Sequence, residues 1–155
     1  MTTTLLRDIL IARKRVEDYF DGSVPTNLWR AFNTRNQNTQ PMDLIEKGFY
    51  KSNGEFREAD IKITPVNGES WVLVQHYPGG LSTFDKSKVF TGKAWEYFRI
   101  AAGTKLPEGL AVVKDRFNAI YGATHYTLAP ARDMKLSEFK LLLRILFNEM
   151  KKEVG

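Results

Sequence analysis

The apolar positions of the chain follow a helical period at both ends and a strand period in between. Near the N-terminus an apolar stripe recurs at steps of four and three residues: Leu5, Ile9, Ala12, Val16 and Tyr19. This spacing predicts an amphipathic helix over residues 4–21. Thr4 is a suitable N-cap for this helix, and Gly22 is a suitable stop.

The C-terminal segment predicts a second amphipathic helix, with Ser137 as its expected N-cap. Its apolar stripe consists of Leu136, Phe139, Leu143, Leu146 and Met150. Such a stripe is far more typical of a helix that packs on a core than of a cofactor site.

The segments between the two helices favour strands and turns. Strands are expected at residues 27–32, 61–64, 70–77, 95–100 and 110–114 and within 122–130. Asn53-Gly54 and Asn67-Gly68 have the chemistry of tight hairpin turns, because both residues of such a pair tolerate positive φ. We therefore expect a β-meander over residues 49–77. A polar loop over 33–41, a short helix over 43–47 and a connector over 115–121 complete the prediction.

The order of helix, strands and helix is that of an α+β fold, in which mainly antiparallel, twisted sheets are flanked by N- and C-terminal helices. A chain of 155 residues is expected to form a single domain. We divide it into an N-terminal helix (1–22), a sheet core (23–130) and a C-terminal helix (131–155).

Composition argues against several classes of protein. The sequence has no cysteine and two histidines, so we expect no disulfide, no thiol nucleophile and no metal site. No apolar run reaches membrane-spanning length, and the N-terminus lacks the pattern of a signal peptide. The net charge of +5 permits a nucleic acid, an acidic protein or a phosphate-bearing ligand as partner. Because the basic residues are scattered, nucleic acid is possible but not indicated.

The stretch from Gly122 to Pro130 carries the first candidate groups. Alternation places His125 and Thr127 on one face of a strand, with Tyr126 and Leu128 on the other. A titratable ring beside several hydroxyls suits a binding or catalytic site. A lone histidine is also commonly a buried residue bonded to nearby backbone, so the pattern leaves both readings open.

Two earlier stretches supply the other candidates. Trp29 and Arg30 lie in a predicted strand, where the guanidinium either reaches the surface or grips a phosphate. Ser82 and Thr83 supply hydroxyls just after Pro78-Gly79-Gly80, a turn whose bare backbone permits close approach of a ligand.

These groups fit few known kinds of active site. The sequence lacks the motifs of α/β-hydrolases, dinucleotide-binding dehydrogenases and zinc deaminases. The remaining set is Arg30, Ser82, Thr83, His125 and Tyr126. One cation, several hydroxyls and one titratable base suit an anionic, hydroxyl-rich ligand such as a dinucleotide.

Three motifs resemble the type VI secretion exported toxin two family, interbacterial effectors with an ADP-ribosyltransferase-like fold. The motifs are Gly79-Gly80-Leu81-Ser82-Thr83-Phe84-Asp85, Gly103-Thr104-Lys105-Leu106-Pro107 and Ala123-Thr124-His125-Tyr126-Thr127-Leu128-Ala129-Pro130-Ala131. They cover about the last half of the chain at nearly constant spacing, and the Thr-His-Tyr-Thr block is the most specific. Trp29-Arg30-Ala31 is similar to an early strand of the family. Where the family has a Thr-Ser pair after the glycines, this chain has Leu81-Ser82.

The resemblance implies a cleft that binds NAD as a substrate. By analogy, Arg30 grips the phosphates or a ribose, and Ser82 and Thr83 bond the nicotinamide ribose. His125 and Tyr126 occupy the third strand position of the site. The implied catalytic residues are thus Arg30, Ser82 and His125, and the implied NAD contacts are Trp29, Gly80, Thr83 and Tyr126.

The resemblance also implies a biological role. Such a toxin is produced in the cytoplasm, is delivered to the cytoplasm of a recipient cell, modifies an intracellular target and arrests growth. A cognate immunity protein blocks it by binding. The residues themselves leave open a glycohydrolase, an unusual phosphotransferase, an RNA-directed transferase and a non-enzymatic basic binding module.

Overall fold

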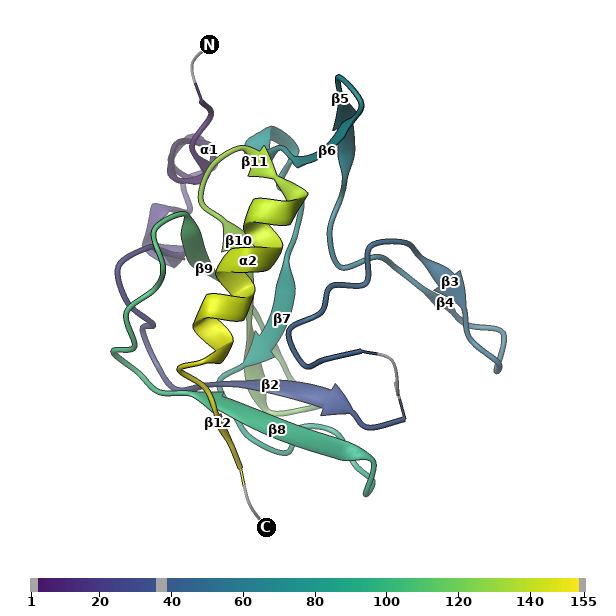
Figure 1. The fold of residues 1–155 in the computed structure, drawn as a ribbon. Helices are drawn as coiled ribbons and strands as arrows, with labels where there is room; N and C mark the ends of the chain where they lie inside the picture. Colours follow the sequence, from purple (N-terminus) through teal and green to yellow (C-terminus); the bar gives the residue numbers. More distant parts are fainter. Residues whose placement is uncertain (1–2, 36–38, 154–155) are drawn as a thin grey trace.

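The computed structural model describes residues 3–35 and 39–153. In this part of the chain the central element is a twisted seven-stranded sheet of order β1-β9-β10-β7-β2-β8-β12, and its neighbouring strands are antiparallel (Figure 1). Its strands are β1 (Tyr19–Phe20), β2 (Leu28–Asn33), β7 (Leu81–Phe84), β8 (Trp95–Ile100), β9 (Leu110–Asn118), β10 (Ala123–Pro130) and β12 (Lys151–Lys152).

Two smaller sheets and two helices complete the described fold. One small sheet has the order β11-β6-β5, and the other is the hairpin β3-β4. Their strands are β3 (Phe49–Tyr50), β4 (Phe56–Arg57), β5 (Thr64–Val66), β6 (Glu69–Val72) and β11 (Met134–Lys135). The helices are α1 (Leu6–Ala12) and α2 (Leu136–Phe147), with 3-10 turns η1 (Val16–Asp18) and η2 (Val74–His76). No described helix is both long and apolar enough to cross a membrane.

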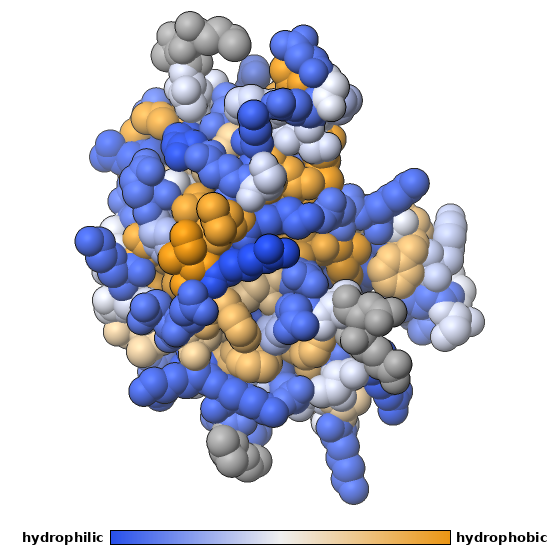
Figure 2. All heavy atoms as spheres, viewed as in Figure 1, coloured by the Kyte–Doolittle hydropathy of each residue, from blue (hydrophilic) through white to orange (hydrophobic). Residues whose placement is uncertain are grey.

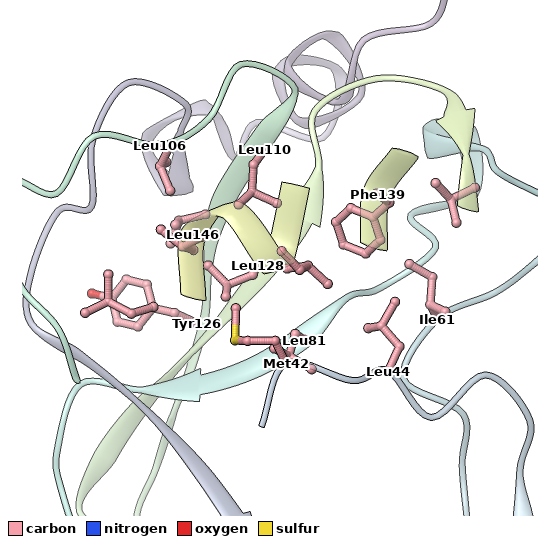
Figure 3. Close-up of a cluster of buried hydrophobic side chains, with 14 of the residues drawn as sticks. Met42, Leu44, Ile61, Leu81, Leu106, Leu110, Tyr126, Leu128, Phe139 and Leu146 are labelled. Carbon is pink, nitrogen blue, oxygen red and sulfur yellow. The ribbon is translucent and has the colours of Figure 1, made fainter. Parts of the chain in front are cut away.

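The helices cover opposite faces of the sheet. Because successive strand residues point to opposite faces, Leu128 joins the large core under α2, whereas Ala129 joins a smaller cluster with Leu6 and Leu10 of α1. In the large core, Phe139 and Leu146 of α2 lie over Leu128 (Figure 3). The outer side of α2 leaves Leu141 and Ile145 exposed, and apolar atoms gather there (Figure 2).

The large sheet opens between β2 and β7. β2 pairs with β8 along its full length, from Leu28 to Asn33, but pairs with β7 only at Trp29 and Phe84 among the described residues. Beyond that pair the two strands diverge. In Figure 1, β7 stands upright while β2 and β8 run across below it. The mainly antiparallel, helix-flanked fold predicted above is therefore confirmed, with a division in its sheet that periodicity does not reveal.

The N-terminal helix is shorter than the predicted 4–21. It spans Leu6–Ala12, and Lys14 then adopts a left-handed backbone with φ of 58°. Tyr19 instead pairs with Val113 as an edge strand. Thr4 is not the cap, because the N-cap is Leu5 and makes no side-chain cap bond. Sheet pairing thus overrides an amphipathic pattern that continued past the helix.

The C-terminal helix has its predicted core face, since Leu136, Phe139, Leu143 and Leu146 are buried. It begins at Leu136 rather than after Ser137, and its N-cap Lys135 makes no side-chain cap bond. The chain enters it from β11, whose Lys135 pairs with Trp71. The last stripe residue, Met150, lies beyond the helix end and packs partly buried on the core.

Residues 43–57 depart most from their prediction. No helix forms at 43–47, because Ile45 bonds by both backbone groups to Asp60: its N–H donates to the carboxylate (2.7 Å), and its carbonyl accepts from the Asp60 N–H (2.7 Å). The meander is instead two separate hairpins, β3-β4 and β5-β6. Of the two turns, only Asn67-Gly68 has positive φ at both residues, while at the other only Gly54 does.

Three further strand boundaries were predicted wrongly. The strand expected over 61–64 is β5, which begins only at Thr64 and ends at Val66. The strand expected over 70–77 ends at Val72, and η2 begins two residues later. The connector expected over 115–121 is partly strand, because β9 continues to Asn118. Residues 36–38 of the predicted loop lie outside the described residues, as do the chain ends at 1–2 and 154–155.

The two glycines before β7 are required by packing. A Cβ on Gly80 would lie 2.0 Å from the carbonyl oxygen of Leu128, and one on Gly79 would lie 2.6 Å from that of Asp60. The sequence suggested that the bare backbone of this turn lets a ligand approach. In the structure it lets other parts of the chain approach instead.

A substitution at Gly80 tests this close approach. We expect Gly80→Ala to destabilise the fold by about 3 kcal/mol or more, because the clash is with backbone and cannot be relieved by a rotamer change. Gly22→Ala is the matched control, since a Cβ there has no atom within 4 Å. It should change the stability by less than about 1 kcal/mol. Urea denaturation measures both, and equal stabilities would contradict the packing role.

Candidate functional site

A cavity of about 830 Å³ lies where β2 and β7 diverge. Its walls come from β2, from the segment 39–45, from the β3-β4 hairpin, from β7 and from the segment around β8. The lining residues are Arg30, Ala31, Phe32, Asn33, Thr39, Gln40, Asp43, Leu44, Ile45, Phe49, Lys51, Arg57, Ser82, Phe84, Phe90, Trp95 and Tyr121. The opening in the sheet thus gives a concave site of the size that small-molecule ligands occupy.

Arg30 bridges the opening. Its Nη1 donates to the backbone carbonyl of Ser82 on β7 (3.2 Å), and its Nε donates to the carbonyl of Pro41 (2.8 Å). Burial lowers the pKa of Arg30 to about 10, with Asp60 acting to raise it and Arg57 to lower it. A group with this pKa remains a cation at neutral pH.

Arg30 forms no ion pair with a carboxylate of the described residues. Asp60 is engaged elsewhere, because its carboxylate accepts from Arg57 (2.8 Å) and from the backbone N–H of Ile45. A partly buried cation held by neutral carbonyls favours the binding of an anion, since an anion would supply the charge compensation that its surroundings lack.

A group of aromatic side chains in mutual contact, here called the aromatic wall, also lines the cavity. The Phe90 and Trp95 rings stack with centroids 4.5 Å apart. Tyr121 meets Phe90 edge to face at 5.1 Å and Phe84 at 5.6 Å. Flat apolar faces beside a cation suit a ligand that combines a planar ring with a negative charge.

The β3-β4 hairpin contributes one rim of the cavity. Phe49, Lys51 and Arg57 line the cavity from this side. Phe49, Tyr50 and Phe56 are large apolar or aromatic side chains that stay exposed, and apolar atoms show over the hairpin in Figure 2. The rim is thus both basic and aromatic, like the interior.

Two of the predicted site residues lie together in the cavity wall: Arg30 and Ser82. Thr83 lies on the other face of β7, fully buried, and its hydroxyl donates to the carbonyl of Tyr126 (2.9 Å). Tyr126 belongs to the large core. Burial, followed by the charges of Asp85 and Asp18, raises the pKa of its phenol.

Trp29 and Gly80 lie outside the lining of the cavity. Trp29 pairs with Phe84 across the strands, and its indole N–H is buried without a hydrogen-bond partner in the described part of the chain. Gly80 is buried against the backbone of Leu128. Trp29 is adjacent to Arg30 and pairs with Phe84, which both line the cavity, whereas Gly80 stands two residues before the lining residue Ser82.

His125 lies one side chain behind the cavity. Its ring meets Phe84, which lines the cavity, edge to face with centroids 5.2 Å apart. Its Nδ1 is 2.7 Å from a carboxylate oxygen of Asp115 on β9. As predicted, Thr127 shares its face of β10, and its hydroxyl donates to the same oxygen (2.5 Å).

Sequence reasoning missed Asp115 and the aromatic wall. Asp115 lay in the expected connector, because the three consecutive charged residues Lys114, Asp115 and Arg116 break the apolar pattern although β9 continues through them. Phe90 and Tyr121 lie outside regular strands, so no periodicity marks them. Among the described residues no group of three or more histidine or acidic side chains could hold a metal ion.

A family model described as "Tse2 ADP-ribosyltransferase toxin" matches residues 3–154 of the chain. The chain belongs to this family. The resemblance identified from the motifs is thereby confirmed, and so is the ADP-ribosyltransferase fold.

A curated relative of the Tse2 family is similar over a shorter stretch. Toxin Tse2 of Pseudomonas aeruginosa is 43% identical over 56 residues, which are 36% of this chain and 35% of the relative. The match thus spans about a third of the relative's length. Membership of the Tse2 family is shown by the family model, which covers nearly the whole chain.

Proposed function

We propose that this protein is a toxin that transfers ADP-ribose from NAD to an intracellular target, with the cavity between β2 and β7 as its NAD site. The observation that carries the proposal is Arg30, a partly buried guanidinium that reaches the cavity and has no carboxylate partner within the described residues. Membership of the ADP-ribosyltransferase toxin family supports it.

The cavity wall matches the chemical parts of NAD. The diphosphate needs cations. Arg30 supplies one without a carboxylate partner among the described residues, and Lys51 and Arg57 add basic groups from the hairpin, where Arg57 is paired with Asp60. The nicotinamide and adenine rings need flat apolar partners, which the stacked Phe90 and Trp95 provide. The volume lies within the range of about 300–1,000 Å³ that is common for ligand sites.

Ser82 is the hydroxyl that we assign to the nicotinamide ribose. Its backbone carbonyl is engaged by Arg30, so the guanidinium fixes the strand that presents the hydroxyl. Trp29, Gly80, Thr83 and Tyr126 pack beside or behind this strand. We assign to them the support of the site, and direct contact with NAD to Arg30, Ser82 and the aromatic wall.

The reaction breaks the bond between the ribose C1′ and the nicotinamide nitrogen. A nucleophile of the target bonds to C1′, nicotinamide leaves, and a base accepts the proton that the nucleophile releases. We assign this base to His125, whose ring packs against Phe84 outside the lining of the cavity. This assignment requires the target nucleophile to approach beside Phe84, within hydrogen-bond reach of the imidazole. Arg30 contributes by holding the diphosphate while positive charge develops on the ribose.

The biological part of the proposal follows from the family. The toxin acts in the cytoplasm of a recipient bacterium, arrests its growth and is blocked by a cognate immunity protein. The net charge of +5 favours an acidic surface on that immunity protein, because opposite charges speed the association of two proteins.

Replacing Arg30 tests the assignment of the site. We expect Arg30→Gln to lower nicotinamide release from NAD about a hundredfold, because the variant lacks the charge that holds the diphosphate. His125→Gln should lower turnover and leave the KM for NAD nearly unchanged, since His125 does not line the cavity. Nicotinamide release is measured with and without lysate of a sensitive bacterium as the source of target.

Arg99→Gln is the matched control, an exposed arginine on neighbouring β8 that should retain full activity. Full activity of both Arg30→Gln and His125→Gln would contradict the site assignment. Nicotinamide release that is independent of lysate, with no ADP-ribose on any macromolecule, would indicate a glycohydrolase instead.

Tryptophan fluorescence tests the aromatic wall separately. We expect ADP-ribose to quench the fluorescence of the protein, because Trp95 lines the cavity and stacks on Phe90. Trp95→Phe should abolish the quenching. Trp71→Phe, on β6 and outside the lining of the cavity, should retain it. Quenching that persists without Trp95 would place the ligand elsewhere.

A further inference from the structure

Asp115 is the centre of a polar cluster on the α1 face of the sheet. One of its carboxylate oxygens, Oδ2, lies 2.7 Å from Nδ1 of His125 and accepts a hydrogen bond from Thr127 (2.5 Å). Its other oxygen lies 3.9 Å from a guanidinium nitrogen of Arg15. The Asp115 and His125 side chains are only 23% and 26% exposed, so solvent weakens these contacts less than it would on an open surface.

An irregularity of the sheet brings Asp115 to His125. Thr124 pairs with Phe117 and Tyr126 with Lys114, so the single residue His125 faces two residues of β9, Asp115 and Arg116. Such a bulge redirects side chains and is common beside functional sites. Arg15 holds the bulged strand from outside, because it also donates to the carbonyl of Lys114 (3.0 Å).

The contact with Asp115 determines which nitrogen of the imidazole carries the proton. An ionised carboxylate accepts hydrogen bonds and donates none. A neutral His125 that bonds to it through Nδ1 must therefore carry its hydrogen on Nδ1. Nε2, on the opposite side of the ring from the carboxylate, is then the nitrogen with a free lone pair.

We propose that Asp115 is a positioning residue for the transfer reaction, which fixes His125 in the Nδ1–H tautomer and holds its ring against Phe84 of the cavity wall. This inference rests on the proposed function for its catalytic part. Asp115 does not line the cavity, and it acts on the reaction through the imidazole of His125. A base with its proton-accepting nitrogen already defined needs no tautomer exchange before it accepts the proton of the target.

The charged and titratable groups around His125 agree with this role. Asp115 faces it from β9, and Arg15 reaches the far oxygen of that carboxylate. Tyr77 lies near the same carboxylate from the side of η2, and burial, followed by the charge of Asp115, raises the pKa of its phenol. The phenol therefore stays neutral at physiological pH, and Asp115 is the negative charge that His125 meets.

Nitrogen-15 NMR of histidine-labelled protein tests the tautomer directly. The chain has two histidines, His76 and His125, so the spectrum of His76→Gln assigns the signals of His125. At a pH of about 8, where an ordinary imidazole is neutral, we expect His125 to be mainly the Nδ1–H tautomer. Asp115→Ala should reverse this to the Nε2–H tautomer. Asp115→Asn should keep Nδ1–H, because the amide oxygen still accepts.

Nicotinamide release then tests the catalytic consequence. We expect Asp115→Ala to lower turnover about tenfold to a hundredfold, as with other residues that orient a functional imidazole, at a nearly unchanged KM for NAD. Asp115→Asn should restore part of the turnover. Asp18→Asn is the matched control: Asp18 binds Arg15 (3.2 Å) without contact to His125, so turnover and tautomer should both stay as in the unmodified chain.

The outcomes separate this inference from the proposed function. If NMR shows the Nε2–H tautomer in the unmodified protein, the inference is overturned. That measurement requires no NAD and does not depend on the proposed function. A reversed tautomer in Asp115→Ala with unchanged turnover would overturn the positioning role. If the unmodified protein shows the expected tautomer but releases no nicotinamide, the proposed function fails while the Asp115–His125 geometry stands.

Discussion

The guanidinium of Arg30 connects β2 to β7 where the two strands, within the described part of the chain, lack backbone hydrogen bonds to each other. Where β2 and β7 separate, backbone groups lose the partners that a continuous sheet would give them. Arg30 donates to one carbonyl on β7 and to another on the segment that enters the opening. A planar fork with several donors can join two acceptors in this way, whereas a lysine would offer a single compact charge. The sheet stays joined at this point and still leaves a cavity.

This arrangement puts a charge where a protein would not place one for stability alone. Burial lowers the pKa of Arg30, which means that the folded environment disfavours the charged form. Carbonyl oxygens soften this cost but carry no net charge. Groups kept in such surroundings are concentrated at functional sites. In the proposed NAD site, the same partial burial favours an anion that would compensate the charge of Arg30.

Sequence reasoning succeeded where local pattern and tertiary packing agree. The stripe of α2 and the alternation along β10 follow from burial on one side, so periodicity predicts them. It failed where distant pairing decides. Tyr19 is drawn into an edge strand by Val113, and Ile45 is held extended by Asp60. Arg30 and Ser82 could be named from their motifs, but the opening that unites them is a property of register, which one sequence does not display.

The aromatic wall and Asp115 are functional groups that the sequence alone could not place, for the same reason. Phe90 and Tyr121 come from irregular segments, and they contact each other and Phe84 edge to face. Asp115 reaches His125 through a bulge, and the pairing of β9 with β10 had to be known before the carboxylate could be placed. A motif search finds the histidine and the serine. The groups that orient them can be identified only when the register of the strands is known.

Phe84 is where these features join. Among the described residues it forms the single pair between β7 and β2, with Trp29 opposite it, and it pairs with His125 on the other side. Its ring contacts His125 and Tyr121 and lines the cavity. Phe84 therefore contacts both the point where β2 and β7 are still paired and the imidazole that Asp115 holds. Only one imidazole and one phenyl ring separate that carboxylate from the cavity, and the two rings are in edge-to-face contact.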